Sequence, residues 1–141
     1  MKEISVLSFN SSSTFKGSDF AGTILAHPLN NNGYEHEVLL LEADFVTTDQ
    51  GTGFVHIAPG HGADDFELGR QNNLPIPETV SDNGILNSDL PLLGGLRVLK
   101  DNEIIADIMS EHDALIGRGK LNHSYPHSWR SKAPLVFRTT P

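Results

Sequence analysis

Sixteen consecutive residues constrain this chain more than any others, and they are Gly51-Thr52-Gly53-Phe54-Val55-His56-Ile57-Ala58-Pro59-Gly60-His61-Gly62-Ala63-Asp64-Asp65-Phe66. Four glycines let the backbone turn sharply and let a ligand approach the main chain closely. The two histidines and two adjacent carboxylates are groups that bind amines, position water or move protons. Few purely structural requirements call for this combination, so we expect the functional site in this stretch.

The local signals around this stretch predict a strand, a bend and a helix. Residues 53–58 are predicted to form a buried strand that ends at Pro59. Residues 63–72 are predicted to form a short helix, with Asp64 and Asp65 in its first turn, where carboxylates interact favourably with the helix dipole. The bend between strand and helix would then hold most of the chemistry-bearing side chains.

The clearest helix signal lies further along the chain. It runs from Asn102 to about Leu115, with Asp101 as candidate N-cap and Gly117 just beyond its end. Its apolar residues recur at helical spacing, at Ile104, Ile105, Ile108, Met109 and Leu115. Further strands are predicted at residues 4–9, 97–100 and 135–141. Residues 35–46 are predicted to form one long strand, or two strands with a break near Glu42-Ala43-Asp44.

Length and composition indicate a single globular domain. The chain has 141 residues, of which 38% are hydrophobic and 20% are charged. It contains no cysteine, which excludes disulfides and thiolate metal sites and suits a cytosolic protein. No apolar run approaches the ~20 residues that span a bilayer, and the first residues lack a signal-peptide pattern. We therefore expect a cytoplasmic domain without a membrane contact.

The charge distribution leaves two interpretations open. A net charge of −8 argues against a domain that grips a nucleic-acid backbone by itself. The ten Lys and Arg residues are scattered, with a modest late concentration at Arg118, Lys120, Arg130, Lys132 and Arg138. That late segment could meet an RNA end or another domain, although a solvated basic face is the interpretation that charge alone favours.

His56 and Asp65 could form a site, but their spacing is equally typical of structural roles. A histidine at a strand end and an aspartate in the next helix turn can face one crevice, where the carboxylate would bind an ammonium group. A capping aspartate and a hydrogen-bonded core histidine would show the same spacing. His61 and Asp64 are also metal-ligand types, yet the sequence has no compact zinc spacing, so we predict no metal. Nucleophile-elbow and phosphate-loop motifs are absent as well.

The tail is rich in ring-bearing side chains. Four of them lie within His123-Ser124-Tyr125-Pro126-His127-Ser128-Trp129-Arg130. His123 and His127 are four apart, but Pro126 disfavours the helix that would align them as ligands. We interpret Tyr125 and Trp129 as packing residues with polar ends.

Two long motifs give the chain a recognisable resemblance. Residues 51–66, followed by His123-Ser124-Tyr125-Pro126-His127-Ser128-Trp129-Arg130-Ser131-Lys132-Ala133-Pro134-Leu135-Val136-Phe137-Arg138-Thr139-Thr140-Pro141, resemble the editing domain of isoleucyl-tRNA synthetases. The resemblance covers roughly residues 17–141. Valyl- and leucyl-tRNA synthetases carry related domains, but Pro59-Gly60-His61-Gly62 and the Tyr-Pro-His-x-Trp-Arg pattern favour the isoleucyl enzymes.

The resemblance implies a fold and a place in a larger protein. The fold would be mixed α/β and strand-rich, with a distorted β-barrel core and two or three peripheral helices. Residues 1–141 would form a single domain, the latter part of the editing insertion of a larger class I synthetase. The family's pocket also uses a threonine-rich segment, which neither Thr47-Thr48 nor Thr139-Thr140 matches. We therefore expect either that one wall of the pocket lies outside this chain or that this protein differs from the family.

The resemblance also implies a reaction. In isoleucyl-tRNA synthetases the synthetic site cannot strongly reject valine, which lacks one methylene group of isoleucine. A second, smaller site in the same enzyme hydrolyses the wrong product. The editing domain would hydrolyse valine mischarged on isoleucine tRNA, as well as valyl-adenylate. It would need no metal or cofactor, with ATP bound only by the catalytic domain of the parent enzyme. The expected partners are the 3′ end of isoleucine tRNA and the remainder of the synthetase.

By position, the resemblance implies roles for individual residues in hydrolysis. Asp65 would bind the substrate α-ammonium, and His56 would line the side-chain pocket and help to reject isoleucine; these two are the candidate catalytic residues. His61, Gly60 and Gly62 would bring the backbone of the bend close to the substrate. Asp64 would be a helix-start residue. No general base is assigned.

Two other functions remain open. The domain could belong to a valyl-tRNA synthetase and reject threonine. It could instead be a catalytically incomplete module that docks on tRNA or on its parent without turnover, because the threonine-rich segment is not found. Deacylation assays would discriminate between them.

Overall fold

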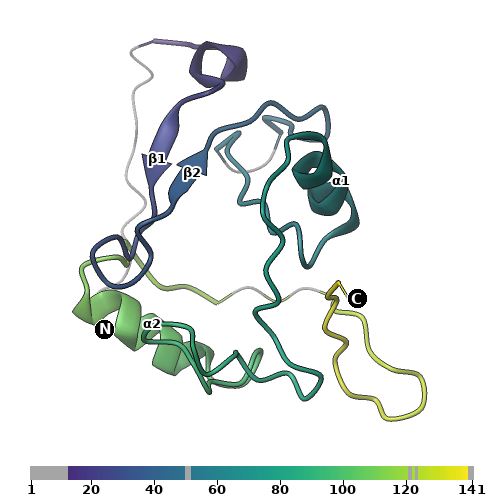
Figure 1. The fold of residues 1–141 in the computed structure, drawn as a ribbon. Coiled ribbons are helices and arrows are strands. Elements are labelled where there is room, and N and C mark those ends of the chain that lie inside the picture. Colours follow the sequence, from purple (N-terminus) through teal and green to yellow (C-terminus); the bar gives the residue numbers. More distant parts are fainter. Residues whose placement is uncertain (1–12, 50–51, 121, 123, 140–141) are drawn as a thin grey trace.

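The computed structural model describes residues 13–49, 52–120, 122 and 124–139. Along the chain, a short 3-10 helix at Gly17–Phe20 is followed by strands β1 (Ile24–Ala26) and β2 (Glu37–Leu39). Two α-helices follow, α1 at Ala63–Gln71 and α2 at Asn102–Glu111. Turns and extended segments make up most of the remainder (Figure 1). The predicted strand at residues 4–9 lies outside the described residues.

Strands β1 and β2 form an antiparallel hairpin. Ile24 pairs with Leu39 and Ala26 pairs with Glu37, so the pairing covers the full length of both strands. The predicted strand at residues 35–46 is thus confirmed only near its start, at β2. The connecting loop turns back through Gly33, whose φ is +92°. A Cβ atom at that position would lie 2.4 Å from the Pro91 ring, so glycine allows the loop to approach this distant segment.

Helix α1 confirms the predicted helix at residues 63–72 to within one residue. Asp64 and Asp65 lie in its first turn, and Gly62 precedes it in an extended conformation. The helix ends at Asn72 and Asn73, and Asn73 adopts the left-handed conformation that asparagine tolerates. On its inner face Gly69 is buried, and a Cβ atom there would lie 2.8 Å from Pro59. The missing side chain therefore allows helix and bend to pack directly together.

Helix α2 begins where the sequence predicts and ends earlier. Asp101 is its N-cap residue, but its carboxylate makes no capping hydrogen bond. It instead accepts hydrogen bonds from the backbone and guanidinium N–H groups of Arg97, which lower the pKa of Asp101. The helix stops at Glu111 because Asp113 turns left-handed, with φ of +55°, and the Ala114 N–H bonds to the Met109 carbonyl. Gly117 is thus not the residue that ends the helix.

The mixed α/β class is confirmed, but the barrel core is not. Within the described residues, the one sheet has two strands and is not closed. Residues 53–58 and 97–100 are extended or turning segments outside any named strand, and Phe54 and Val55 are more than half exposed, contrary to the prediction of a buried strand. Isolated bridges such as Val80 with Leu86 take the place of ladders. A strand needs a partner along its length, and these segments pair only at single points.

The buried core is small for the length of the chain. Leu29 and Val80 are the buried hydrophobic residues among those described. The chain exposes 11722 Å², against about 7000 Å² expected for a folded monomer of its mass. In the described residues, neither helix packs against the sheet or against the other helix. Short-range hydrogen bonds and turn contacts therefore hold much of the fold. None of the described helices is long and apolar enough to cross a membrane.

The contact between Gly69 and Pro59 reverses the usual effect of a helix substitution. Gly→Ala in a helix interior normally stabilises by about 0.5–1 kcal/mol. Gly69→Ala should instead destabilise by about 1–2 kcal/mol, because overpacking costs about 1–3 kcal/mol. Urea unfolding measures the difference. Gly17→Ala is the control, since a Cβ atom at Gly17 has no neighbour within 4 Å; a stabilised Gly69→Ala variant would contradict the close packing.

Candidate active site at the 58–65 bend

The bend that links residues 53–58 to helix α1 is built by main-chain hydrogen bonds. The N–H groups of His61 and Gly62 both donate to the Ala58 carbonyl, at 2.8 and 3.3 Å. The Phe66 N–H donates to the Gly62 carbonyl at 2.8 Å, which begins the helical pattern. Proline at position 59 cannot donate such a bond, so the turn starts at Ala58. The chain thereby reverses within a few residues.

Asp65 closes the bend from the helix side. Its Oδ2 atom accepts a hydrogen bond from the Ala58 N–H at 2.9 Å. A Cβ atom on Gly62 would lie 2.9 Å from the same Oδ2, so glycine at that position lets the carboxylate reach across the turn. Neither a free carboxylate nor a simple helix cap describes this arrangement. Asp65 is half-buried, and its orientation is fixed by the backbone that it holds.

His61 joins the bend to two distant segments. Its Nδ1 lies 2.8 Å from the Phe137 carbonyl oxygen, and its Nε2 lies 3.3 Å from Thr79 Oγ1. Because a carbonyl can only accept, Nδ1 carries the proton in the neutral ring, and Nε2 accepts from the threonine hydroxyl. The Thr139 N–H also donates to the Gly60 carbonyl, at 2.8 Å. Both ring nitrogens of His61 are therefore engaged, Nδ1 with the C-terminal segment at Phe137 and Nε2 with Thr79.

His56 lies near the bend but does not pair with Asp65. It is exposed, and no hydrogen bond or ion pair joins the two side chains in the described structure. The link between them runs through the backbone, because Asp65 binds the N–H of Ala58, two residues after His56. The structure thus places His56 just before the bend and Asp65 at its helix end, and the two side chains do not form an acid–base pair.

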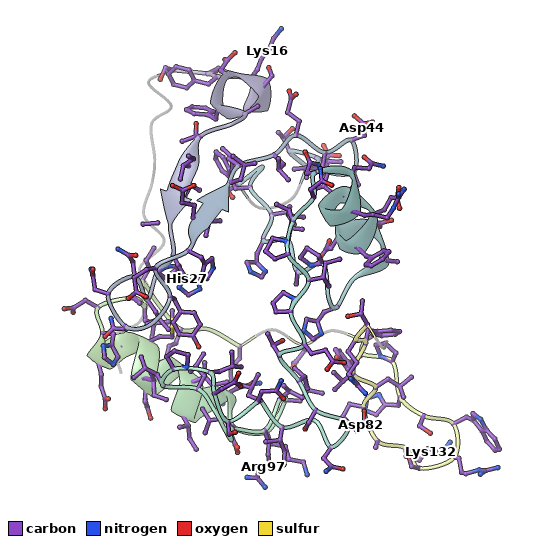
Figure 2. The ribbon with its side chains drawn as sticks, in the orientation of Figure 1. Lys16, His27, Asp44, Asp82, Arg97 and Lys132 are labelled. Atoms are coloured by element: carbon purple, nitrogen blue, oxygen red, sulfur yellow. The ribbon has the colours of Figure 1, made fainter. Side chains whose placement is uncertain are left out.

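A further histidine that sequence reasoning missed belongs to a cluster of rings with Tyr34 and His36. His27 follows β1, and Figure 2 shows it at the loop end of the hairpin. Its ring stacks on Tyr34, with centroids 4.8 Å apart, and lies 5.0 Å from the His36 ring. The Tyr34 hydroxyl donates to the Pro91 carbonyl at 2.8 Å, which anchors this group. Folding brings His27 against Tyr34 and His36, a contact that no motif in the sequence indicates.

The protonation state of His27 is set by its surroundings. Its Nδ1 accepts a hydrogen bond from the Leu29 N–H at 3.0 Å, so the neutral ring carries its proton on Nε2. Burial lowers the pKa of His27 below its ordinary value of 6.5, and repulsion from His36 and His56 lowers it further. The ring is therefore held as a neutral group with one fixed N–H donor.

A cavity of about 350 Å³ lies on the C-terminal side of the bend. Among the predicted site residues, His61 lines it, whereas Asp65 and His56 do not. Its remaining lining is mostly apolar and comprises Thr79, Val80, Leu86, Val98, Leu99, Tyr125, Val136 and Phe137. Tyr125 lines this cavity and is 37% exposed, so its packing stays a prediction. In the described parts of the chain, no three histidines or carboxylates are arranged to hold a metal ion.

The two roles of Asp65 can be separated by substitution. Asp65→Ala leaves the Ala58 N–H without its acceptor and should destabilise the chain by about 1–2 kcal/mol. Asp65→Asn keeps an amide oxygen at the same place, so it should lose less than half as much. Urea unfolding of the two variants gives the comparison. Equal losses would show that the carboxylate charge, rather than the hydrogen bond, stabilises the bend.

The lowered pKa of His27 makes stability depend on pH. Between pH 6.5 and the lower pKa of the folded state, the unfolded chain binds more protons, so stability falls as pH falls through this window. His27→Asn keeps an acceptor for the Leu29 N–H and removes the titration. Denaturant midpoints should therefore fall less steeply with acidification in the variant, and should run parallel to wild type above pH 6.5. Identical pH profiles would contradict this assignment.

Known proteins are similar in sequence to this chain over its whole length. Residues 2–91 match the family model described as leucyl-tRNA synthetase, editing domain. The chain is 47% identical over 141 residues to isoleucine–tRNA ligase of Pelagibacter ubique, covering 100% of this chain and 16% of that protein. It is 48% identical over 139 residues to isoleucine–tRNA ligase of Gluconobacter oxydans, covering 91% of this chain and 14% of that protein. The chain therefore spans a small part of its relatives, and it belongs to the aminoacyl-tRNA synthetase editing-domain family as an isoleucyl-tRNA synthetase editing domain.

Proposed function

We propose that this chain supplies part of the site that hydrolyses valine from mischarged isoleucine tRNA, and valine from its adenylate. The observation that carries the proposal is the Asp65 carboxylate, which is fixed by the Ala58 N–H at the start of helix α1. The match to a family model described as an editing domain, together with relatives named isoleucine–tRNA ligase, supports an editing role within such an enzyme. Ligation of isoleucine to tRNA would require ATP and the catalytic domain of the whole synthetase.

Asp65 would bind the α-ammonium group of the substrate. Its Oδ2 is engaged with the backbone, so Oδ1 would accept the charge-assisted hydrogen bond from the ammonium. Because the hydrogen bond to Ala58 already fixes the rotamer, little conformational entropy would be lost on binding. The ester carbonyl would then be held at a set distance from the bend, where water can attack it.

His56 would decide which side chain enters the site. It is exposed on the segment that leads into the bend, so its ring can form a wall without first breaking a contact with Asp65. A wall that excludes one extra methylene rejects isoleucine by steric overlap, whereas a binding pocket can reject valine only weakly. The synthetic site therefore acts first and rejects larger side chains, and the editing site then hydrolyses products that are small enough to enter it.

His61, Gly60 and Gly62 would act through the shape of the bend. His61 ties the bend to Phe137 and Thr79, and Gly62 makes room for the Asp65 carboxylate. A rigid bend would present main-chain groups to the developing oxyanion at no reorganisation cost. No side chain is assigned as general base in this proposal, and no metal or cofactor takes part. The attacking water would be positioned by the substrate and the backbone.

The remainder of the synthetase would complete the domain. Phe54 and Val55 are more than half exposed on the segment next to the site. Further strands of the parent's editing insertion would cover this segment and close the barrel that the family resemblance implies. The other partner would be the 3′ end of isoleucine tRNA, and the enzyme would work in the cytoplasm.

A docking module without turnover is the second candidate function. The large exposed surface of the chain favours it, since half of a site does not preorganise a substrate. In that case the chain would bind tRNA or the rest of the synthetase, and hydrolysis would depend on other parts of the parent enzyme.

Deacylation of valyl-tRNA charged on isoleucine tRNA tests the proposed function. The purified chain should release valine faster than it releases isoleucine from the same tRNA, and faster than it releases threonine from valine tRNA. Asp65→Asn should slow valine release about 10- to 100-fold, because one charge-assisted hydrogen bond is lost. The matched control is Asp64→Asn, which makes the same charge change at an exposed neighbour and should leave the rate unchanged.

Each other outcome identifies a different function. Preferential release of threonine would assign the domain to valyl-tRNA editing. A folded chain that releases no amino acid would favour the docking module. Equal slowing by Asp64→Asn and Asp65→Asn would contradict the assignment of Asp65 as the ammonium-binding residue.

A further inference from the structure

The charges of this chain are divided between two parts of the sequence. Residues 1–113 contain five Lys and Arg against eighteen Asp and Glu, a formal charge of −13. Residues 114–141 contain five Lys and Arg with no Asp or Glu, a formal charge of +5. The overall charge of −8 hides this division. An anionic partner would therefore be repelled by most of the chain and attracted to the C-terminal part.

Ion pairs within the protein use some of these late cations and not others. Arg118 pairs with Asp107 at 2.6 Å and with Glu103 at 3.6 Å. Arg138 pairs with Asp82 and Glu78. In contrast, no described acid lies within ion-pair distance of Arg130 or Lys132. Arg118 and Arg138 thus serve the fold, while Arg130 and Lys132 keep their charges available to a partner.

Arg130 and Lys132 lie at the tip of a small hairpin, residues 126–135, which we call the basic hairpin. The Leu135 N–H donates to the Pro126 carbonyl at 3.0 Å, and the Ser128 N–H donates to the Ala133 carbonyl at 2.9 Å. Lys132 takes a left-handed conformation, with φ of +59°, to complete the turn. In Figure 1 this segment, in yellow, extends away from the helices, and Figure 2 shows Lys132 at its outer end.

Trp129 stands at the same tip and is 78% exposed, so the prediction that it packs is wrong. The Arg130 guanidinium carbon lies 5.2 Å from the centre of its ring. This cation–π contact holds the two side chains together. An exposed aromatic ring beside available cations is the combination that binds single-stranded nucleic acid, because bases stack on the ring and phosphates pair with the cations.

We propose that the basic hairpin binds the single-stranded 3′ end of the tRNA, with a base stacked on Trp129 and phosphates paired with Arg130 and Lys132. The inference rests on the proposed function, which makes a charged tRNA the substrate. An acidic protein partner would account for the exposed cations but not for the exposed ring of Trp129 beside them. The basic hairpin therefore supplies a nucleic-acid contact separate from the 58–65 bend.

Equilibrium binding of an uncharged RNA tests this contact independently of hydrolysis. The probe is a labelled single-stranded RNA of about eight nucleotides that ends in CCA. Trp129 is the sole tryptophan, so quenching of intrinsic fluorescence on RNA addition reports stacking on that ring directly. Trp129→Ala should raise the Kd about tenfold, and Trp129→Phe should recover most of the affinity. Both variants alter an exposed side chain, and circular dichroism would verify that each is folded.

The salt dependence of binding separates phosphate pairing from stacking. Arg130→Gln and Lys132→Gln should each reduce the slope of log Kd against log salt by about 0.7, as expected when one phosphate contact is lost. Lys100→Gln is the matched control, because it removes one charge in the acidic part of the chain and should leave the slope unchanged. Trp129→Phe should also leave the slope unchanged.

Three results would overturn the proposal: no binding of the RNA to the wild-type chain at low salt, an unchanged Kd in Trp129→Ala, or unquenched tryptophan fluorescence at saturating RNA. An unchanged Kd or unquenched fluorescence would leave the basic hairpin as a contact with the remainder of the synthetase. Loss of valine release together with intact, Trp129-dependent RNA binding would instead refute the proposed function and retain the RNA contact.

Discussion

The hydrogen bond from the Ala58 N–H to Asp65 Oδ2 is the constraint on which the arrangement of the site depends. It joins the end of the extended segment to the first turn of α1, so the bend cannot open without losing it. Two glycines make this closure possible: Gly62 leaves room for the carboxylate, and Gly69 lets the helix lie against Pro59. The residue that closes the bend is also the candidate ligand for an ammonium group. Fold and recognition are thus coupled through one side chain, and a substitution there changes both.

The C-terminal segment extends this constraint across the chain. His61 reaches the Phe137 carbonyl, Gly60 accepts from the Thr139 N–H, and Arg138 pairs with Asp82. These contacts connect residues that are far apart in sequence and compensate for a small apolar core. They also explain why a histidine in a glycine-rich bend can be a structural residue: its two nitrogens have different partners, one an acceptor and one a hydroxyl donor. The bend is held from both sides, by α1 and by this segment.

The features that the sequence predicts correctly are those that depend on local signals. Helix α1 follows from the acidic first turn after Gly62, and the start of α2 follows from Asp101 and the apolar spacing after it. Sequence reasoning failed where distant contacts decide. The end of α2 depends on a left-handed Asp113, and the contact of His27 with Tyr34 and His36 arises only on folding. The strands of a barrel need partners that single segments do not reveal. Trp129 was predicted to pack because aromatic residues usually do, yet its hairpin carries it to the tip. That His56 and Asp65 flank the same turn follows from their spacing, whereas the absence of a contact between their side chains does not.

The division of charge fits the chemistry of a single substrate. An aminoacyl ester at the end of a tRNA carries a cationic ammonium group within a few bonds of its ester, and anionic phosphates further along the strand. Under the proposed function, the carboxylate of Asp65 would meet the first and the tip of the basic hairpin would meet the second. The repulsion of RNA by the acidic part of the chain would then favour one orientation of the strand over its reverse, since only one places each charge beside its opposite. Electrostatics would thus contribute more to the direction of binding than to its strength, and the fixed orientation of Asp65 would set the final position of the ester.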